Sequence, residues 1–248
     1  MLLNILILFV AAVSGGIFNI IIPEQKGHGF GLSLVFAGSY LFSITIIHLI
    51  PGLYASGQDT FHISILILAG FFLQQVLEYF TSGIEHGHLH HKDKQHHHTR
   101  LSAFTVVIAL SIHAFLEGTL VTNPMNHGIH SQNSTLLMGI LLHKIPAAYA
   151  LMSIVTCQLK SRQMAVLLLL FFAFASPAGL FLSDITYRNQ LITDQTFTIL
   201  FALVSGSFLH ISTTIVFESN PQHAFGKRRF SMAVIGALAA IVFEYLLK

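Results

Sequence analysis

The sequence predicts an all-α, polytopic membrane protein. Of its 248 residues, 54% are hydrophobic and only 9% are charged, and the mean hydropathy is +0.73, values far from those of a water-soluble domain. Apolar segments long enough to cross a hydrocarbon core as a helix, which takes about 20 residues, recur eight times. Since a segment in lipid must satisfy its own backbone hydrogen bonds, we expect a helix at each one.

The eight apolar segments account for most of the chain, so we expect a single transmembrane domain over residues 1–248. The first segment lacks a basic leading region and a clear small-x-small cleavage site, which favours a membrane helix over a cleaved signal. In chain order, the expected spans are 2–22, 30–50, 61–81, 101–121, 135–155, 164–182, 197–217 and 230–247.

Basic residues are concentrated in the odd-numbered loops, which hold nine of the 12 lysines and arginines. Because basic residues near span ends tend to remain in the cytoplasm, we expect cytoplasmic odd loops and two non-cytoplasmic termini. Spans one to three and six to eight then run in opposite directions around a central pair, a 3+2+3 arrangement expected of an inverted repeat. The nine basic residues are Lys26, Lys92, Lys94, Arg100, Lys160, Arg162, Lys227, Arg228 and Arg229.

Charge and cysteine content exclude other classes of partner and site. A formal net charge of +2 gives no reason to expect nucleic acid as a partner. The single cysteine, Cys157, has no partner for an internal disulfide and lies in no metal-binding motif. The lipid bilayer is therefore the partner that composition predicts.

Two ionisable residues interrupt the fourth span, in the segment IALSIHAFLEGTLV. Ionisable groups are costly inside a bilayer, so they usually face the bundle interior and serve a site or a pathway. The i, i+4 spacing of His113 and Glu117 places both side chains on one helix face, where they could bind the same ion. A histidine hydrogen-bonded to a glutamate for helix packing would give the same pattern.

The fifth span adds a third ligand candidate, because the segment LLHKIPAAYAL places His143 and Lys144 at a similar depth. Pro146 lacks an N–H group and should kink the helix beside His143. Local distortion of this kind is tolerated where a membrane helix lines a polar cavity. Two histidines and a carboxylate form a three-ligand set suited to zinc, with one coordination position left open.

The motifs HAFLEG and HKIPAA, in the fourth and fifth of eight spans, resemble those of the Zrt/Irt-like protein (ZIP) family of divalent-metal transporters. The resemblance covers the whole chain in span number and orientation, and it implies a transport site at His113, Glu117 and His143. Some members hold two metals, and this chain departs from their pattern at Ala114, Lys144, Ala147 and Ser176. Since an ammonium group repels a second cation, we expect a single metal and a pairing of Lys144 with Glu117.

Polar residues in the other spans are weaker candidates. His48, in IIHLIPG, resembles the family's His-Leu-Leu-Pro pattern and is a candidate pathway ligand, although an interfacial histidine touching water would look the same. His210 has no metal motif around it and is expected to serve helix packing. Glu78 and Glu244 lie near span ends, where we expect solvent to reach them, so structural roles are favoured. Close helix approach is the expected role of five glycines: Gly38, Gly118, Gly139, Gly179 and Gly206.

The third loop, at about residues 82–100, contains the histidine-rich segment EHGHLHHKDKQHHH. It has no apolar pattern that could fold alone, so we expect disorder. Clustered imidazoles can capture metal at the cytoplasmic mouth, less well as pH falls through about 6.5, and transport should survive deletion of the loop. A solvated spacer is the alternative. The histidines are His86, His88, His90, His91, His96, His97 and His98.

The function implied by these residues and by the resemblance is transport of Zn²⁺ into the cytoplasm, with Fe²⁺ and Mn²⁺ as further candidates because they use the same ligands. We expect no enzymatic activity, a location in a plasma or inner membrane, and compatibility with a homodimer. One alternative is an intramembrane zinc-dependent hydrolase, although the chain has no His-Glu-x-x-His motif. Another is a metal sensor that binds zinc without transporting it.

Overall fold

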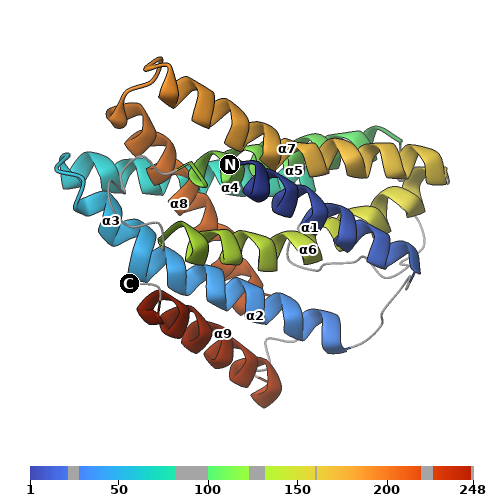
Figure 1. Cartoon of the computed structure of the whole chain (residues 1–248). Helices are drawn as coiled ribbons and strands as arrows, with labels where there is room; N and C mark the ends of the chain where they lie inside the picture. The colour runs from blue at the N-terminus through green and yellow to red at the C-terminus, as the bar shows by residue number, and fades with distance from the viewer. Residues whose placement is uncertain (22–27, 82–99, 123–131, 160, 219–225, 247–248) are drawn as a thin grey trace.

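The computed structural model describes residues 1–21, 28–81, 100–122, 132–159, 161–218 and 226–246. This part of the chain is a bundle of helices without strands (Figure 1). Eight spans in it are long and apolar enough to cross a membrane. The helices are α1 (Leu2–Ile21), α2 (His28–Ile44), the π-helical turn η1 (Thr45–Leu49), α3 (Ile50–Tyr54), α4 (Thr60–Thr81), α5 (Arg100–Leu120), α6 (Gln132–Leu159), α7 (Arg162–Arg188), α8 (Asp194–Glu218) and α9 (Lys227–Leu246).

The all-α class and the eight spans predicted from the sequence are confirmed, and the differences lie at the helix ends. The second span consists of α2, η1 and α3 rather than one regular helix. α6 is continuous through Pro146, and both α6 and α7 extend beyond the predicted spans. At the start of α7, the Ser161 hydroxyl accepts a hydrogen bond from the Met164 amide, so the helix can begin before its apolar segment does.

The helices pack most extensively as pairs that are far apart in the sequence: α4 with α8, α5 with α7, α2 with α9, and α1 with α6. Further contacts of α7 with α1 and α6, and of α2 with α8, define two groups of helices, and α2 also packs against α6 of the other group as extensively as against α8. One group contains α1, α5, α6 and α7, and the other contains α2, α4, α8 and α9. The predicted central pair, α5 and α6, is in contact, but α5 packs more extensively against α7, and α6 packs more extensively against α1.

The buried apolar residues show where the two groups pack against each other. One cluster draws on both groups and includes Leu120, Leu136 and Phe201. A second cluster lies within the first group, where it includes Val106 and Met152. A third is confined to α2 and α8. The two groups therefore share a hydrophobic core at one end of the bundle and have separate cores at the other.

Candidate metal centre

Three side chains with metal-ligand chemistry meet in the bundle interior. His113 and Glu117 lie one turn apart on α5, and His143 lies on α6. Nε2 of His113 is 3.0 Å from Oε1 of Glu117, and Nε2 of His143 is 4.0 Å from the same oxygen. All three side chains are buried. Their ligand atoms lie within 4.8 Å of one another, and no other group of three such residues was found in the part of the chain that the structure describes.

These separations are close to those that zinc requires. Tetrahedral Zn²⁺ holds nitrogen and oxygen ligands at about 2.0–2.2 Å, which places the ligand atoms about 3.3 Å apart. The His113–Glu117 distance of 3.0 Å is already near this value, and the His143–Glu117 distance of 4.0 Å exceeds it by less than about 1 Å. A small side-chain movement would complete the three-ligand set.

A hydrogen-bonded chain orients the imidazole of His113. The Ser207 hydroxyl on α8 donates to Oε1 of Gln74 on α4 at 2.7 Å. Its oxygen can then accept the Nδ1–H of His113, which lies 3.4 Å away. In this tautomer Nε2 presents its lone pair to Glu117, as metal ligation requires. A proton or a metal ion is needed between Nε2 and the carboxylate, since both atoms are then acceptors.

Lys144 occupies the far side of the carboxylate. Its Nζ donates to Oε2 of Glu117 at 3.0 Å and to the Ser176 hydroxyl at 2.5 Å. The Ser176 hydroxyl in turn donates to the Ala114 carbonyl at 2.6 Å, and the ammonium lies 5.3 Å from the centre of the Phe172 ring. The structure thus shows the predicted pairing of Lys144 with Glu117, and it places Ser176 in the same hydrogen-bonded group.

Two glycines bring α5 and α7 close enough for these contacts. A Cβ atom at Gly118 would clash with the carbonyl oxygen of Ser176, and one at Gly179 would clash with the carbonyl oxygen of Phe115. Gly118 directly follows Glu117, so the contact between backbones is made beside the carboxylate. The predicted role of these glycines in close helix approach agrees with this geometry.

Comparison with protein families matches residues 81–243, well over half of the chain, with the ZIP zinc transporter family. The chain belongs to the ZIP family. It is similar to Protein zntD of Dictyostelium discoideum, with 29% identity over an aligned length of 148 residues; the match covers 56% of this chain and 21% of that protein. The chain thus matches about a fifth of the length of that relative.

Membership of the ZIP family confirms the resemblance inferred from the sequence motifs. Together with the eight apolar helices, it identifies a multi-pass integral membrane protein. The family is one of transporters, which is consistent with the expectation that the chain is not an enzyme.

His48 of this ZIP protein lies apart from the three-residue cluster and contacts α9. Nδ1 of His48 is 2.9 Å from Oε1 of Glu244. The prediction that solvent reaches Glu244 is wrong, because only 6% of the residue is exposed. The carboxylate turns inward from the last turn of α9 toward η1, where it meets the histidine. Hydropathy along one span could not reveal a partner 196 residues away in the chain.

His210 and Glu78 form another histidine–glutamate pair. Nδ1 of His210 is 3.4 Å from Oε2 of Glu78, and the imidazole lies edge-on to Phe71, with 4.8 Å between ring centres. The expected packing role of His210 agrees with the aromatic contact. No sequence motif singles out Gln74 or Ser207, because the hydrogen-bonded chain that links them to His113 forms only in the folded bundle.

The seven histidines of the third loop, from His86 to His98, lie outside the described residues. Their predicted role in metal capture stays a prediction.

Proposed function

We propose that this ZIP protein carries Zn²⁺ across the membrane into the cytoplasm through a single site formed by His113, Glu117 and His143. The observation that supports this most strongly is the convergence of the three buried ligand groups from α5 and α6, within 4.8 Å of one another. Ionisable groups are costly at such a depth in a membrane, and a cargo ion gives them a function.

The donor set supports zinc as the cargo. Two imidazole nitrogens and one carboxylate oxygen suit borderline-soft divalent cations, and an incomplete coordination shell allows release. Fe²⁺ and Mn²⁺ use the same donors, so we propose them as secondary cargoes. Because the protein supplies only three ligands, water or a moving side chain would complete the shell and leave again as the ion departs.

The position of Lys144 supports a single ion. Its ammonium is bonded to Oε2 of Glu117 and to Ser176, on the side of the carboxylate away from the two histidines. A second divalent cation there would be repelled by the ammonium at close range. We propose that Lys144 supplies the positive charge that a second metal supplies elsewhere.

The direction of transport rests on the basic loops and on the clusters of apolar residues. With the odd loops in the cytoplasm, the cluster shared by both helix groups, which includes Leu120 and Leu136, closes the non-cytoplasmic end of the bundle. The separate cores lie toward the cytoplasm. We propose that relative movement of the two groups opens the shared cluster and gives alternating access to the site.

The contacts of Glu117 favour transport over hydrolysis. In an intramembrane hydrolase this residue would act as a general base toward a metal-bound water. Here one oxygen faces the histidines and the other accepts from the ammonium of Lys144, an arrangement that stabilises the carboxylate rather than exposing it to water. The histidine-rich loop, proposed to capture metal at the cytoplasmic mouth, also has no evident part in hydrolysis.

Flux measurements on purified protein in liposomes test this proposal. We expect saturable Zn²⁺ flux above that of empty liposomes, competition by Fe²⁺ and Mn²⁺, and loss of flux in His113→Ala, Glu117→Ala and His143→Ala. Zinc binding without flux would instead indicate a sensor, and zinc-dependent peptide cleavage would indicate a hydrolase. Mass photometry of the purified protein tests whether the chain forms a homodimer.

A further inference from the structure

A groove on the surface of the bundle lies between α8 and α9, and α2 forms its floor. Its volume is about 210 Å³. Both α8 and α9 pack against α2, and in the described part of the chain they do not pack extensively against each other, which leaves a gap between them. The lining includes Ser39 and Ser43 of α2, Val216 of α8, and Ala233, Val234 and Ala237 of α9.

The lining of the groove is apolar in effect, although it contains two serines. The Ser43 hydroxyl donates to the Ser39 carbonyl at 2.9 Å, so its polar group is satisfied by its own helix. Val234 is 40% exposed, which shows that the groove is open to the surroundings of the bundle. An unfilled apolar groove loses dispersion contacts, and in a bilayer the material that can fill it is an acyl chain.

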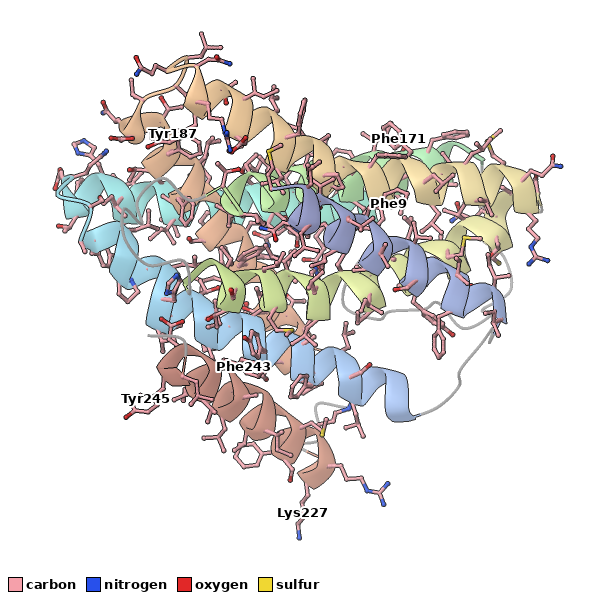
Figure 2. The ribbon with its side chains drawn as sticks, in the orientation of Figure 1. Phe9, Phe171, Tyr187, Lys227, Phe243 and Tyr245 are labelled. Carbon is pink, nitrogen blue, oxygen red and sulfur yellow. The ribbon has the colours of Figure 1, made fainter. Side chains whose placement is uncertain are left out.

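Three basic residues begin the helix that forms one wall of the groove. Lys227, Arg228 and Arg229 are the first residues of α9, and the first turn of this helix contains no acidic residue. Lys227 and Arg228 are exposed and Arg229 is half-buried. Lys227 points away from the bundle (Figure 2). The start of a helix already carries a partial positive charge, which favours acidic residues there. The three cations add to this charge, and an anion would offset it.

The starts of α2 and α9 lie at the same end of the bundle (Figure 1). A Cβ atom at Gly31 of α2 would lie 3.8 Å from Nη2 of Arg229, and one at Gly236 of α9 would clash with the Phe36 carbonyl oxygen. The two helices therefore run side by side in the same direction. Both present the positive end of the helix dipole at this end of the bundle, where phosphate groups bind favourably.

The groove lies directly beyond the basic residues along α9. Ala233 is about 6 Å and Ala237 about 12 Å from Arg229 along the helix axis. One leaflet of a bilayer contributes about 15 Å of hydrocarbon. A phospholipid with its phosphate at Arg229 therefore has its acyl chains at the depth of the groove.

We propose that the start of α9 and this groove bind one anionic phospholipid, whose headgroup contacts Lys227, Arg228 and Arg229 and whose acyl chain lies between α8 and α9. The preference for an anionic lipid comes from the headgroup, because each nearby basic residue attracts it. An acyl chain gains little by exchanging neighbouring lipid for an apolar groove. The basic residues place this lipid in the cytoplasmic leaflet. Its binding is independent of the transported ion.

Photo-crosslinking in phosphatidylcholine liposomes containing the full chain tests the position of the lipid. One probe is phosphatidylglycerol with a diazirine in the middle of an acyl chain, and the other is phosphatidylcholine with the same diazirine. Peptide mass spectrometry should show about tenfold more labelling of the segment Ala233–Ala237 by the anionic probe. Phe72 and Val76, on the exposed face of α4, should be labelled equally by both. Equal labelling of the groove by the two probes would overturn the proposal.

Arg229→Gln tests the headgroup contact. Removing one charge should lower the preference of the groove for the anionic probe about threefold or more, whereas Arg229→Lys keeps the charge and should keep the preference. Arg162→Gln is the matched control, because Arg162 is also an exposed basic residue at the start of a spanning helix, α7. A preference that survives Arg229→Gln, or that falls equally in Arg162→Gln, would contradict the proposed site.

Filling the groove separates a lipid site from general attraction of anionic lipid to basic residues. Val234→Phe adds an aromatic ring to the lining and should reduce labelling of the segment Ser39–Ser43 by the anionic probe about threefold or more. Val242→Phe adds the same ring at an exposed position of α9 outside the groove and should leave labelling unchanged. Unchanged labelling in Val234→Phe would contradict binding of the chain in the groove.

Native mass spectrometry of the unsubstituted chain tests the stoichiometry. We expect one phosphatidylglycerol molecule to remain bound to each chain. Two chains without bound lipid, together with a groove that neither probe labels, would show that a second copy covers the groove and would overturn the proposal.

Discussion

The carboxylate of Glu117 contacts both the candidate metal ligands and the ammonium of Lys144. Oε1 faces His113 and His143, whereas Oε2 accepts from the ammonium of Lys144. A metal ion bound by the histidines and Oε1 therefore shares one carboxylate with the ammonium of Lys144. This sharing weakens metal binding, because the two cations compete for the same negative charge.

Replacing Lys144 with methionine should strengthen zinc binding. Without the ammonium, the whole carboxylate charge is available to the ion, and we expect the zinc Kd to fall about tenfold or more, equivalent to about 1.4 kcal/mol. Isothermal titration calorimetry, in the background with the loop histidines changed to serine, measures this effect. Lys144→Arg keeps the positive charge and is the matched control, with little expected change. Weaker zinc binding in Lys144→Met would show that the lysine supports the metal site rather than competing with it.

The same substitution should destabilise the zinc-free protein. Breaking a buried ion pair costs about 3–5 kcal/mol in other proteins, and Glu117 and Lys144 are each only 1% exposed. Thermal unfolding in detergent should therefore show a lower Tm for Lys144→Met than for the unsubstituted chain, with part of the loss recovered on adding zinc. An unchanged Tm in the absence of zinc would argue that the ion pair makes no net contribution.

At the residue scale, the sequence predicted ligands that lie close together in short motifs. His113 and Glu117 share a helix face by their spacing alone, and His143 is marked by its own motif in the next span. The pairing of Lys144 with Glu117 followed from charge. Gln74, Ser207 and the partner of His48 could not be predicted, because those contacts depend on which faces of distant helices meet.

At the scale of helices, the close approach of α5 and α7 positions the site. Gly118 faces the Ser176 backbone and Gly179 faces the Phe115 backbone, so the two contacts are reciprocal. Small residues at both positions let the backbones touch. The bonds from Lys144 to Ser176 and from Ser176 to the Ala114 carbonyl cross the same interface. The geometry around Glu117 thus depends on this spacing.

Gly118→Ala and Gly179→Ala should each lower the free energy of unfolding by about 1–3 kcal/mol, because the added methyl group forces the helices apart. We also expect reduced zinc flux, since Ser176 moves away from Lys144. Thermal unfolding and liposome flux measure the two effects. Gly52→Ala is the control, because no heavy atom lies within 4 Å of a Cβ atom added there. Unchanged stability in both interface variants would show that α5 and α7 can move apart without lowering the free energy of unfolding.

Hydropathy was sufficient to predict the existence of the spans, because crossing a membrane requires a minimum apolar length. It was insufficient to predict their ends and irregularities. α6 begins three residues before its predicted span and ends four residues after it, since polar residues can continue a helix beyond the apolar segment. The π-helical turn at Thr45–Leu49 depends on the loss of donors at Pro51 and on packing, neither of which changes hydropathy.

At the scale of the whole molecule, two groups of four spanning helices share a core at one end only. The sequence predicted the order of the spans, but not the pairing of α5 with α7 or α1 with α6. These pairings depend on the shapes of helix surfaces rather than on apolar content. An inverted repeat stays a prediction. In the proposed mechanism, transport requires the shared cluster to separate.

Linking the two groups across the shared cluster should block zinc flux. The proposed link joins Tyr40→Cys on α2 with Gly139→Cys on α6, positions already in contact, in a chain carrying Cys157→Ala. A short thiol-reactive crosslinker should then reduce liposome flux about tenfold or more if the groups must separate for each transport cycle. The control pair, Thr119→Cys with Ser183→Cys, lies within one group, where the Ser183 hydroxyl is 3.2 Å from the Thr119 carbonyl. Full flux in the linked Tyr40–Gly139 variant would contradict movement at this interface.

The most direct test of the central claim compares zinc uptake by liposomes containing the unsubstituted chain with uptake by liposomes containing Glu117→Gln. The glutamine keeps the size of the side chain but removes the charge that links His113, His143 and the ion. We expect saturable uptake with the unsubstituted chain, and uptake no greater than that of empty liposomes with Glu117→Gln at equal amounts of reconstituted protein. Equal uptake by the two proteins would show that the ion crosses the membrane without the cluster on α5 and α6.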